Sequence, residues 1–120
     1  LILSQGLAIN ISVADSVVKN SKLNQFLQVD GITSCSVINC TFESISVFNE
    51  LGTLIITSFA GVNSPSLTVA DCSFIGITSL SSIYASNILN LNITRCNFHL
   101  FSENLGRMTL IGLDGSSGTI

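Results

Sequence analysis

Four cysteines are the side chains of this 120-residue sequence best suited to chemistry, as nucleophiles, metal ligands or disulfide partners. Three of them are regularly placed, because Cys40, Cys72 and Cys96 each stand two residues before a phenylalanine. No Cys-x-x-Cys pair occurs and His99 is the only histidine, so no zinc site is expected. A nucleophilic cysteine would need a positioned histidine, and an apolar setting raises the thiol pKa. We therefore expect free thiols packed as small hydrophobes, with one disulfide as the alternative.

Three Asn-x-Ser/Thr sequons offer a different chemistry, the attachment of N-linked glycans. They begin at Asn10, Asn39 and Asn92, and each asparagine is predicted to point outward. Only 9% of the residues are charged, which fits a secreted glycoprotein that sugars keep in solution. We expect these three asparagines to carry glycans in a eukaryotic secretory host. Intact-mass analysis before and after glycosidase treatment tests this, and an unmodified mass would contradict it.

The element that must position these residues is a repeat of about 24 residues. Each unit has two apolar residues separated by a polar one, and then Cys-x-Phe and a further apolar residue. The units start near residues 11, 35, 67 and 91. In the first unit, Ser16 and Val18 replace the cysteine and the phenylalanine. The alternation predicts a strand with one face inward, and the self-similarity predicts a solenoid of stacked coils.

Equivalent residues of successive coils stack as columns in a solenoid. The sequence therefore predicts two inner columns, one of thiols and one of aromatic rings, and the rings pin the register. The columns consist of Cys40, Cys72 and Cys96 and of Phe42, Phe74 and Phe98.

The second coil is longer than the others, because the unit starts lie 24, 32 and 24 residues apart. We place the insertion at residues 57–66, which hold Gly61 and the only proline, Pro65. An insertion in one coil normally projects as a loop. Phe59 and Asn63 are the residues of this loop that we expect to contact a partner, with local packing of Phe59 as the alternative.

Each coil also holds a second apolar patch, so two or three short strands per coil are expected. The patches lie at Phe26–Val29, Leu51–Ile56, Ile83–Ala85 and Met108–Ile111. A leucine-rich repeat is the alternative, since Ile88–Phe98 fits its strand half. Its return segment is often helical, however, and residues 45–50 and 77–84 are rich in serine and β-branched residues that disfavour helix. All-strand coils are the better interpretation.

With Ser82-Ile-Tyr-Ala-Ser-Asn87 followed by Leu91-Asn-Ile-Thr-Arg-Cys-Asn-Phe98, the chain resembles the right-handed parallel β-helix repeats of secreted and surface proteins. The most similar types are the polymorphic outer-membrane-protein and adhesin repeats, also found in large protist surface proteins. The resemblance covers roughly residues 7–111. It implies an all-β fold, a right-handed parallel β-helix of about four coils of about 24 residues. Residues 1–120 would form a single segment of a longer array.

Asp71 and Arg95 occupy one repeat position in adjacent coils, together with Asp15 and Asn39 in the earlier ones. Parallel β-helix enzymes that act on acidic polysaccharides group acidic and basic side chains on an outer face, and this pair is the nearest match. A solvent-exposed ion pair explains it equally simply. We favour the ion pair, and we expect no catalytic, cofactor-binding or metal-binding residue.

Composition excludes several partners. The four basic residues are scattered and the net charge is −3, so neither nucleic acid nor a polybasic membrane site is expected. No apolar run approaches the roughly 18 residues of a membrane-spanning helix. No signal-peptide pattern is visible, which suggests a mature segment or part of a larger chain.

We therefore expect a non-enzymatic structural or adhesive protein, extracellular or at the cell surface, that builds a fibre or filament. Neither end shows a polar cap, so the terminal coils are expected to self-associate by stacking or to continue in a longer chain. The alternatives are a polysaccharide-binding or polysaccharide-processing β-helix and a leucine-rich-repeat interaction module.

Overall fold

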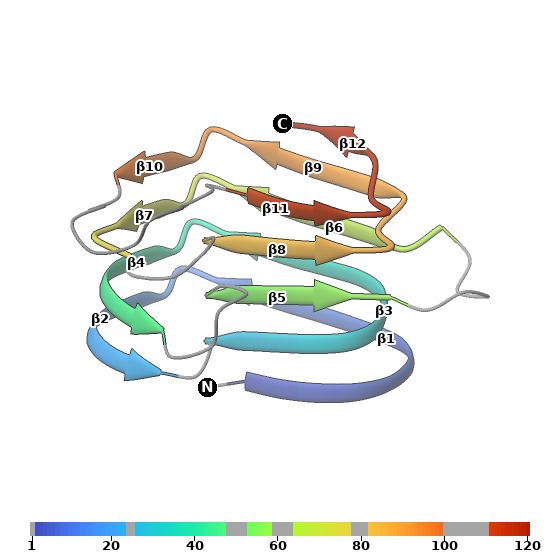
Figure 1. Ribbon diagram of the computed structural model, residues 1–120, viewed down its shortest axis with the longest axis horizontal. Helices are drawn as coiled ribbons and strands as arrows, with labels where there is room; N and C mark the ends of the chain where they lie inside the picture. Colours follow the sequence, from blue (N-terminus) through green and yellow to red (C-terminus); the bar gives the residue numbers. More distant parts are fainter. Residues whose placement is uncertain (1, 24–25, 48–52, 59–63, 78–81, 100–110) are drawn as a thin grey trace.

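A computed structural model describes residues 2–23, 26–47, 53–58, 64–77, 82–99 and 111–120. Within these ranges every regular element is a strand (Figure 1). The strands are β1 (Ile2–Ala14), β2 (Val17–Leu23), β3 (Leu27–Ile38), β4 (Thr41–Val47), β5 (Leu54–Thr57), β6 (Ser66–Ala70), β7 (Ser73–Ile75), β8 (Ile83–Ser86), β9 (Asn90–Thr94), β10 (Asn97–His99), β11 (Ile111–Asp114) and β12 (Gly118–Thr119). No helix in the described ranges has the length and apolarity needed to cross a membrane.

The strands form two sheets in which the pairing is parallel throughout. The larger sheet has the order β11-β8-β5-β3-β6-β9-β12, with β1 also paired to β3, and the smaller has the order β10-β7-β4-β2. β3 joins two rows of strands, because its first part pairs with β5 and its last part with β6. Figure 1 shows β1 and β3 curving from one row into the next. This curled parallel arrangement is compatible with a β-solenoid.

The register joins the residues that the repeat pattern aligns. Ile11 pairs with Cys35, Cys35 with Leu67 and Leu67 with Leu91. Leu91 then pairs with Gly118, which begins a further strand that the repeat pattern does not reveal. The chain therefore returns once more to the same sheet after the last sequence repeat.

The other two rows follow the remaining apolar positions. The smaller sheet stacks Val18, Phe42, Phe74 and Phe98 in order. The second apolar patches form the third row, which stacks Leu27, Leu54, Ile83 and Ile111. With three strand segments per coil and no helix in the described ranges, a leucine-rich repeat with a helical return loses its main support.

The connection between β5 and β6 spans residues 58–65, whereas the corresponding parts of β3 are continuous. By the strand register, five of the eight extra residues of the second coil lie between Leu54 and Leu67, and the other three lie between Phe42 and Leu54. Phe59 and Asn63 lie outside the described residues, so their expected role as contacts stays a prediction.

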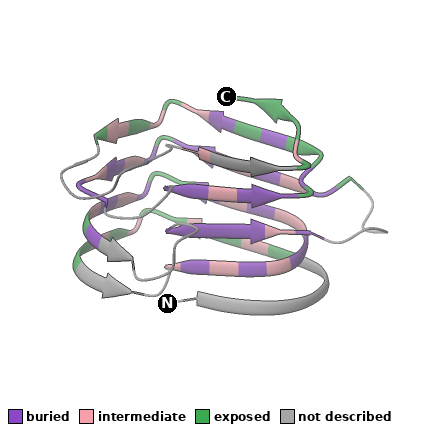
Figure 2. Cartoon of the chain, viewed as in Figure 1, coloured by how far each residue is buried: buried purple, intermediate pink, exposed green. Residues whose placement is uncertain are grey.

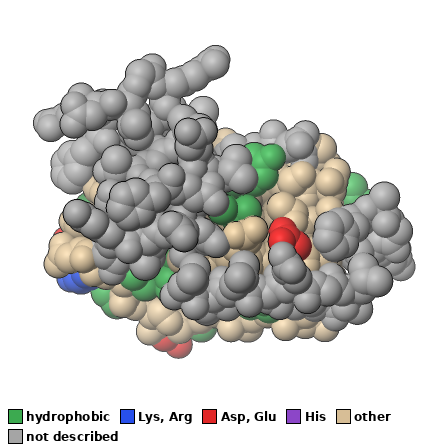
Figure 3. Space-filling view, turned by 60° about the horizontal axis from the view of Figure 1, so that its bottom comes forward, with side chains coloured by type: hydrophobic (Ala, Val, Ile, Leu, Met, Phe, Trp, Pro, Cys, Tyr) green, Lys and Arg blue, Asp and Glu red, His purple; other side chains and the backbone are tan. Residues whose placement is uncertain are grey.

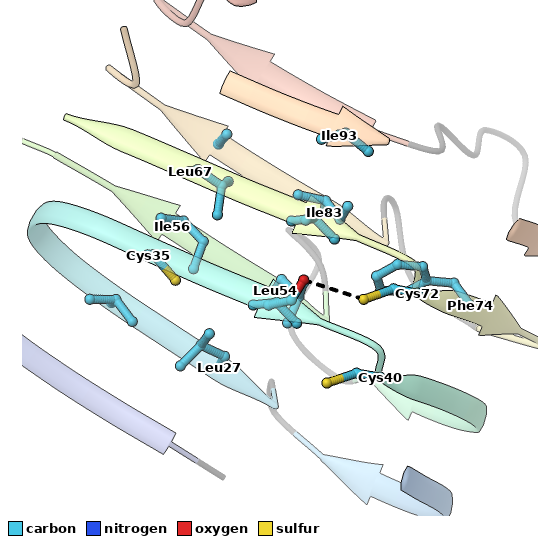
Figure 4. Close-up of a cluster of buried hydrophobic side chains, with 14 of the residues drawn as sticks. Leu27, Cys35, Cys40, Leu54, Ile56, Leu67, Cys72, Phe74, Ile83 and Ile93 are labelled. Carbon is cyan, nitrogen blue, oxygen red and sulfur yellow. Dashed lines mark hydrogen bonds between the residues drawn. The ribbon is translucent and has the colours of Figure 1, made fainter. Parts of the chain in front are cut away.

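The core consists of the inward residues of all three rows. Burial alternates along β3, and fully buried side chains are concentrated in the middle coils (Figure 2). Figure 4 shows the inward side chains of several strands gathered in one cluster, to which Cys40 and Cys72 belong. The largest fully buried side chains include Phe42, Phe74, Leu54, Leu67 and Ile83. Burial of this much apolar surface is the main favourable term for folding.

Candidate functional site

The residues that the sequence singled out at one outer position form the bend between the two sheets. Asp15, Asn39, Asp71 and Arg95 all have positive φ angles, of 53°, 54°, 55° and 50°. Asn and Asp tolerate this left-handed conformation because their short polar side chains bond locally, whereas Arg is uncommon there. In each coil the left-handed residue lies between the end of one strand and the start of the next. We call these four residues the bend column.

Asp71 and Arg95 form a two-pronged ion pair across adjacent coils. Arg95 donates from Nε to Oδ1 of Asp71 at 2.6 Å and from Nη2 to Oδ2 at 2.8 Å. The hydrogen bond from Arg95 holds the pKa of Asp71 below its usual value, and the same bond raises the pKa of Arg95. Both side chains are well exposed, so solvent screens their attraction. A carboxylate with a lowered pKa that is already engaged by a guanidinium is a poor general base.

The other described acidic side chains are also tied to a neighbouring coil. Asp15 accepts a hydrogen bond from Nδ2 of Asn39 at 2.7 Å, and Asp30 accepts one from Oγ1 of Thr57 at 2.6 Å. Oε2 of Glu43 lies 3.1 Å from Nζ of Lys19. On the face drawn in Figure 3, the visible charged side chains are isolated spots and do not form a continuous patch. The described carboxylates thus link coils.

A ladder of uncharged polar side chains covers the outer face of the row formed by β1, β3, β6, β9 and β12. The ladder consists of Asn10, Ser34, Ser66 and Asn90 in one rank and Ser12, Ser36, Thr68, Asn92 and Thr119 in the next. Two of its rungs are hydrogen bonds in which Ser34 Oγ donates to Asn10 Oδ1 at 2.7 Å and Ser36 Oγ to Ser12 Oγ at 3.2 Å. This outer ladder is a hydrogen-bonding surface without charge.

The three sequon asparagines are all exposed, but they do not lie at one place. Asn10 and Asn92 belong to the outer ladder, in the first and fourth coils. Asn39 lies in the bend column, and its Nδ2, the atom that would carry a glycan, donates to Asp15. The outward position of Asn10 and Asn92 follows from strand alternation, and that of Asn39 follows from the bend.

The cysteine column has a structural role that sequence reasoning missed. Cys40, Cys72 and Cys96 each donate from Sγ to the carbonyl two residues earlier, at 3.4, 3.2 and 3.3 Å. Each thiol also lies within 3.9 Å of a valine carbonyl of the preceding coil, and Figure 4 draws this bond for Cys72. In the first coil Ser16 Oγ makes the same bond to Ala14 at 2.9 Å. Serine and cysteine share a hydrogen-bond donor, so the serine at this position of the first unit was the feature of the sequence that indicated this role.

The four cysteines are free thiols. Cys35, Cys40 and Cys72 are buried and Cys96, in the last coil of the column, is half-buried. Burial raises the pKa of Cys35 to about 12 and that of Cys72 to about 11. These two thiols are therefore protonated and unreactive near neutral pH.

Among the residues that the structure describes, no three His, Cys, Asp or Glu side chains gather closely enough to hold a metal ion. Comparisons with protein-family models, with curated proteins and with solved structures found no match to this chain. Among the described residues that the sequence singles out on the outer face, Asp71 contacts Arg95 and Asp15 contacts Asn39, and both pairs are exposed.

Proposed function

We propose that this chain is a non-enzymatic structural or adhesive unit of a surface fibre, a right-handed parallel β-helix that assembles end to end. The observation that carries the proposal is the state of the two ends of the stack. In the described ranges β1 and β2 are paired on one side only, and so are β10, β11 and β12. Unpaired edges present rows of peptide N–H and C=O groups, which are templates for further strands.

The inner columns at the ends support the same proposal. Phe74 and Cys72 are fully enclosed, whereas Phe98 and Cys96, one coil further, are only half-buried. At the opposite end Val18 is also half-buried. A second copy whose β2 paired with β10 would place its Val18 against Phe98 and continue the column. That contact would bury apolar surface on both copies, at about 25 cal/mol per Å².

The right-handed sense is part of the proposal, and the resemblance to β-helix repeats implies it. Parallel strands that are joined by a crossover in one sheet are almost always connected in this sense. The extracellular or cell-surface location is supported by the three sequons and the low content of charge. The non-enzymatic role is supported by the described carboxylates, which link coils.

Sedimentation velocity and electron microscopy of the purified chain test the assembly. We expect concentration-dependent particles that grow in length, and we expect Phe98→Lys to reduce them to single units. The long lysine stem can still cover Phe74 while its charge blocks the stacking of another coil. The matched control is Asn97→Lys, an outward position on the same strand, which should assemble like the parent chain.

Circular dichroism would verify that both variants are folded. A parent chain that stays monomeric up to its solubility limit contradicts end-to-end assembly. Assembly of Phe98→Lys to the parent extent would contradict the proposed contact at β10.

Polysaccharide binding is the second candidate, and the outer ladder favours it. Its hydroxyl and amide groups recur in every coil along the stack, and a chain of sugar hydroxyls pairs with such groups. A glycan array on the monomeric Phe98→Lys variant separates the two candidates. Retained binding that Thr68→Val abolishes would favour the polysaccharide, and an array without binding would favour the structural role.

A further inference from the structure

Two buried hydroxyls in this fold have no hydrogen-bond partner. Thr53 and Ser82 are both 0% exposed. Thr53 Oγ1 and Ser82 Oγ are the buried side-chain oxygen or nitrogen atoms without a partner in the described part of the chain. Buried polar groups are nearly always bonded, because a group taken from water without a partner loses its hydration and gains nothing. An explanation is needed for two such groups in one small fold.

The two hydroxyls occupy one repeat position in adjacent coils. Leu54 pairs with Ile83, so the residues that precede them, Thr53 and Ser82, are stacked. The peptide N–H of Leu54 donates to the carbonyl of Ser82 at 3.1 Å and holds the two segments together. One coil earlier the same position is Phe26, whose peptide N–H donates to the backbone carbonyl of Thr53 at 3.0 Å. The polar pair therefore follows an aromatic residue in this column.

We propose that Thr53 and Ser82 together hold one buried water molecule between two coils. Equivalent atoms of neighbouring strands lie about 4.8 Å apart, whereas a direct O–H···O bond spans only about 2.5–3.0 Å. One water with a bond of about 2.8 Å to each oxygen spans this separation at an angle close to tetrahedral. Buried waters occur where two or more polar groups that lack other partners face each other. Both side chains are fully enclosed, so bulk solvent does not reach the two hydroxyls.

A third buried hydroxyl shows how this fold satisfies such groups directly. Ser58 is 2% exposed, and its Oγ donates to the carbonyl of Ile32 at 3.0 Å. Ser58 directly follows β5 and Thr53 directly precedes it, so the two residues flank the same strand. Ser58 is therefore a matched control, a buried hydroxyl on the same coil that needs no water.

A crystal structure that resolves ordered water tests the proposal, together with denaturant unfolding of variants. We expect a water peak within hydrogen-bonding distance of both hydroxyl oxygens, absent in Thr53→Val and retained in Ser58→Ala. Thr53→Val and Ser82→Ala should each raise the unfolding equilibrium constant about two- to tenfold. The double variant should lose less than the product of the two effects, because both hydroxyls bind one water.

Absence of the water peak overturns the proposal, even if the hydroxyls turn out to bond to each other as Ser36 and Ser12 do. A lower unfolding constant in Thr53→Val also overturns it, since removal of an unpaired hydroxyl stabilises a core. Independent effects of the two substitutions would equally exclude a shared water.

Discussion

Phe74→Ala is expected to lower the free energy of unfolding by about 3–5 kcal/mol. Phe74 is 0% exposed and lies between two parallel rings, with centroids 5.1 Å from Phe42 and 5.1 Å from Phe98. Its removal opens a cavity in the middle of the aromatic column and ends both ring contacts. Domains of this size are stable by only about 5–15 kcal/mol, so the variant would lose a large share. Urea unfolding followed by far-UV circular dichroism measures the loss.

Phe98→Ala is the matched control for this prediction. Phe98 is half-buried and, among the rings that the structure describes, stacks only on Phe74, so its removal should cost clearly less. Equal losses for the two variants would mean that the column does not carry the stability assigned to it.

The register could be predicted from the sequence because bulky residues mark it. A cysteine followed two residues later by a phenylalanine recurs in three of the units, and a shift of one residue would turn every side chain to the other face. The row that stacks Ile11, Cys35, Leu67 and Leu91 follows directly from this constraint. The last strand could not be predicted, because Gly118 has no side chain to continue the pattern. A Cβ at that position would overlap the carbonyl of Leu91, so the close approach of β12 to β9 requires glycine.

The continuity of β3 was equally hidden. The sequence shows an apolar patch from Phe26 and a repeat unit from Cys35, which suggests two strands with a break between them. Gly31, with a φ angle of 82°, lets the chain bend without ending the strand. In the later coils the equivalent bend is a break between two strands.

The chemistry of the candidate residues depended on contacts that a sequence does not display. Asp71 and Arg95 were paired by their spacing, but their left-handed backbone was not foreseen, because arginine is uncommon at positive φ. The unpaired hydroxyls of Thr53 and Ser82 look like ordinary turn residues until the coils are stacked. The repeat position of each of these residues was therefore predictable, whereas its backbone conformation, its burial and its hydrogen bonds were not.

The second large effect is expected at alkaline pH. Burial raises the pKa of the Cys35 thiol from 9.0 to about 12 and that of Cys72 to about 11. In the unfolded chain both thiols ionise near their ordinary value, while the folded chain still holds both protons. The stability that these groups contribute is complete below pH 9 and is lost as the pH rises through the folded pKa values. Each thiol should lower the free energy of unfolding by about 1.4 kcal/mol per pH unit in that window.

Urea titrations from neutral pH to pH 11 measure this slope under reducing conditions. Cys35→Ala removes one of the two thiols and should reduce the slope by about 1.4 kcal/mol per pH unit, although the variant starts from a lower stability. Val37→Ala is the matched control, because Val37 is buried on the same strand and has no proton to release. It should lower stability by a similar amount at every pH and leave the slope unchanged. A parent slope that Cys35→Ala fails to reduce would show that Cys35 does not release its proton on unfolding, and its place in the dry inner column would then be wrong.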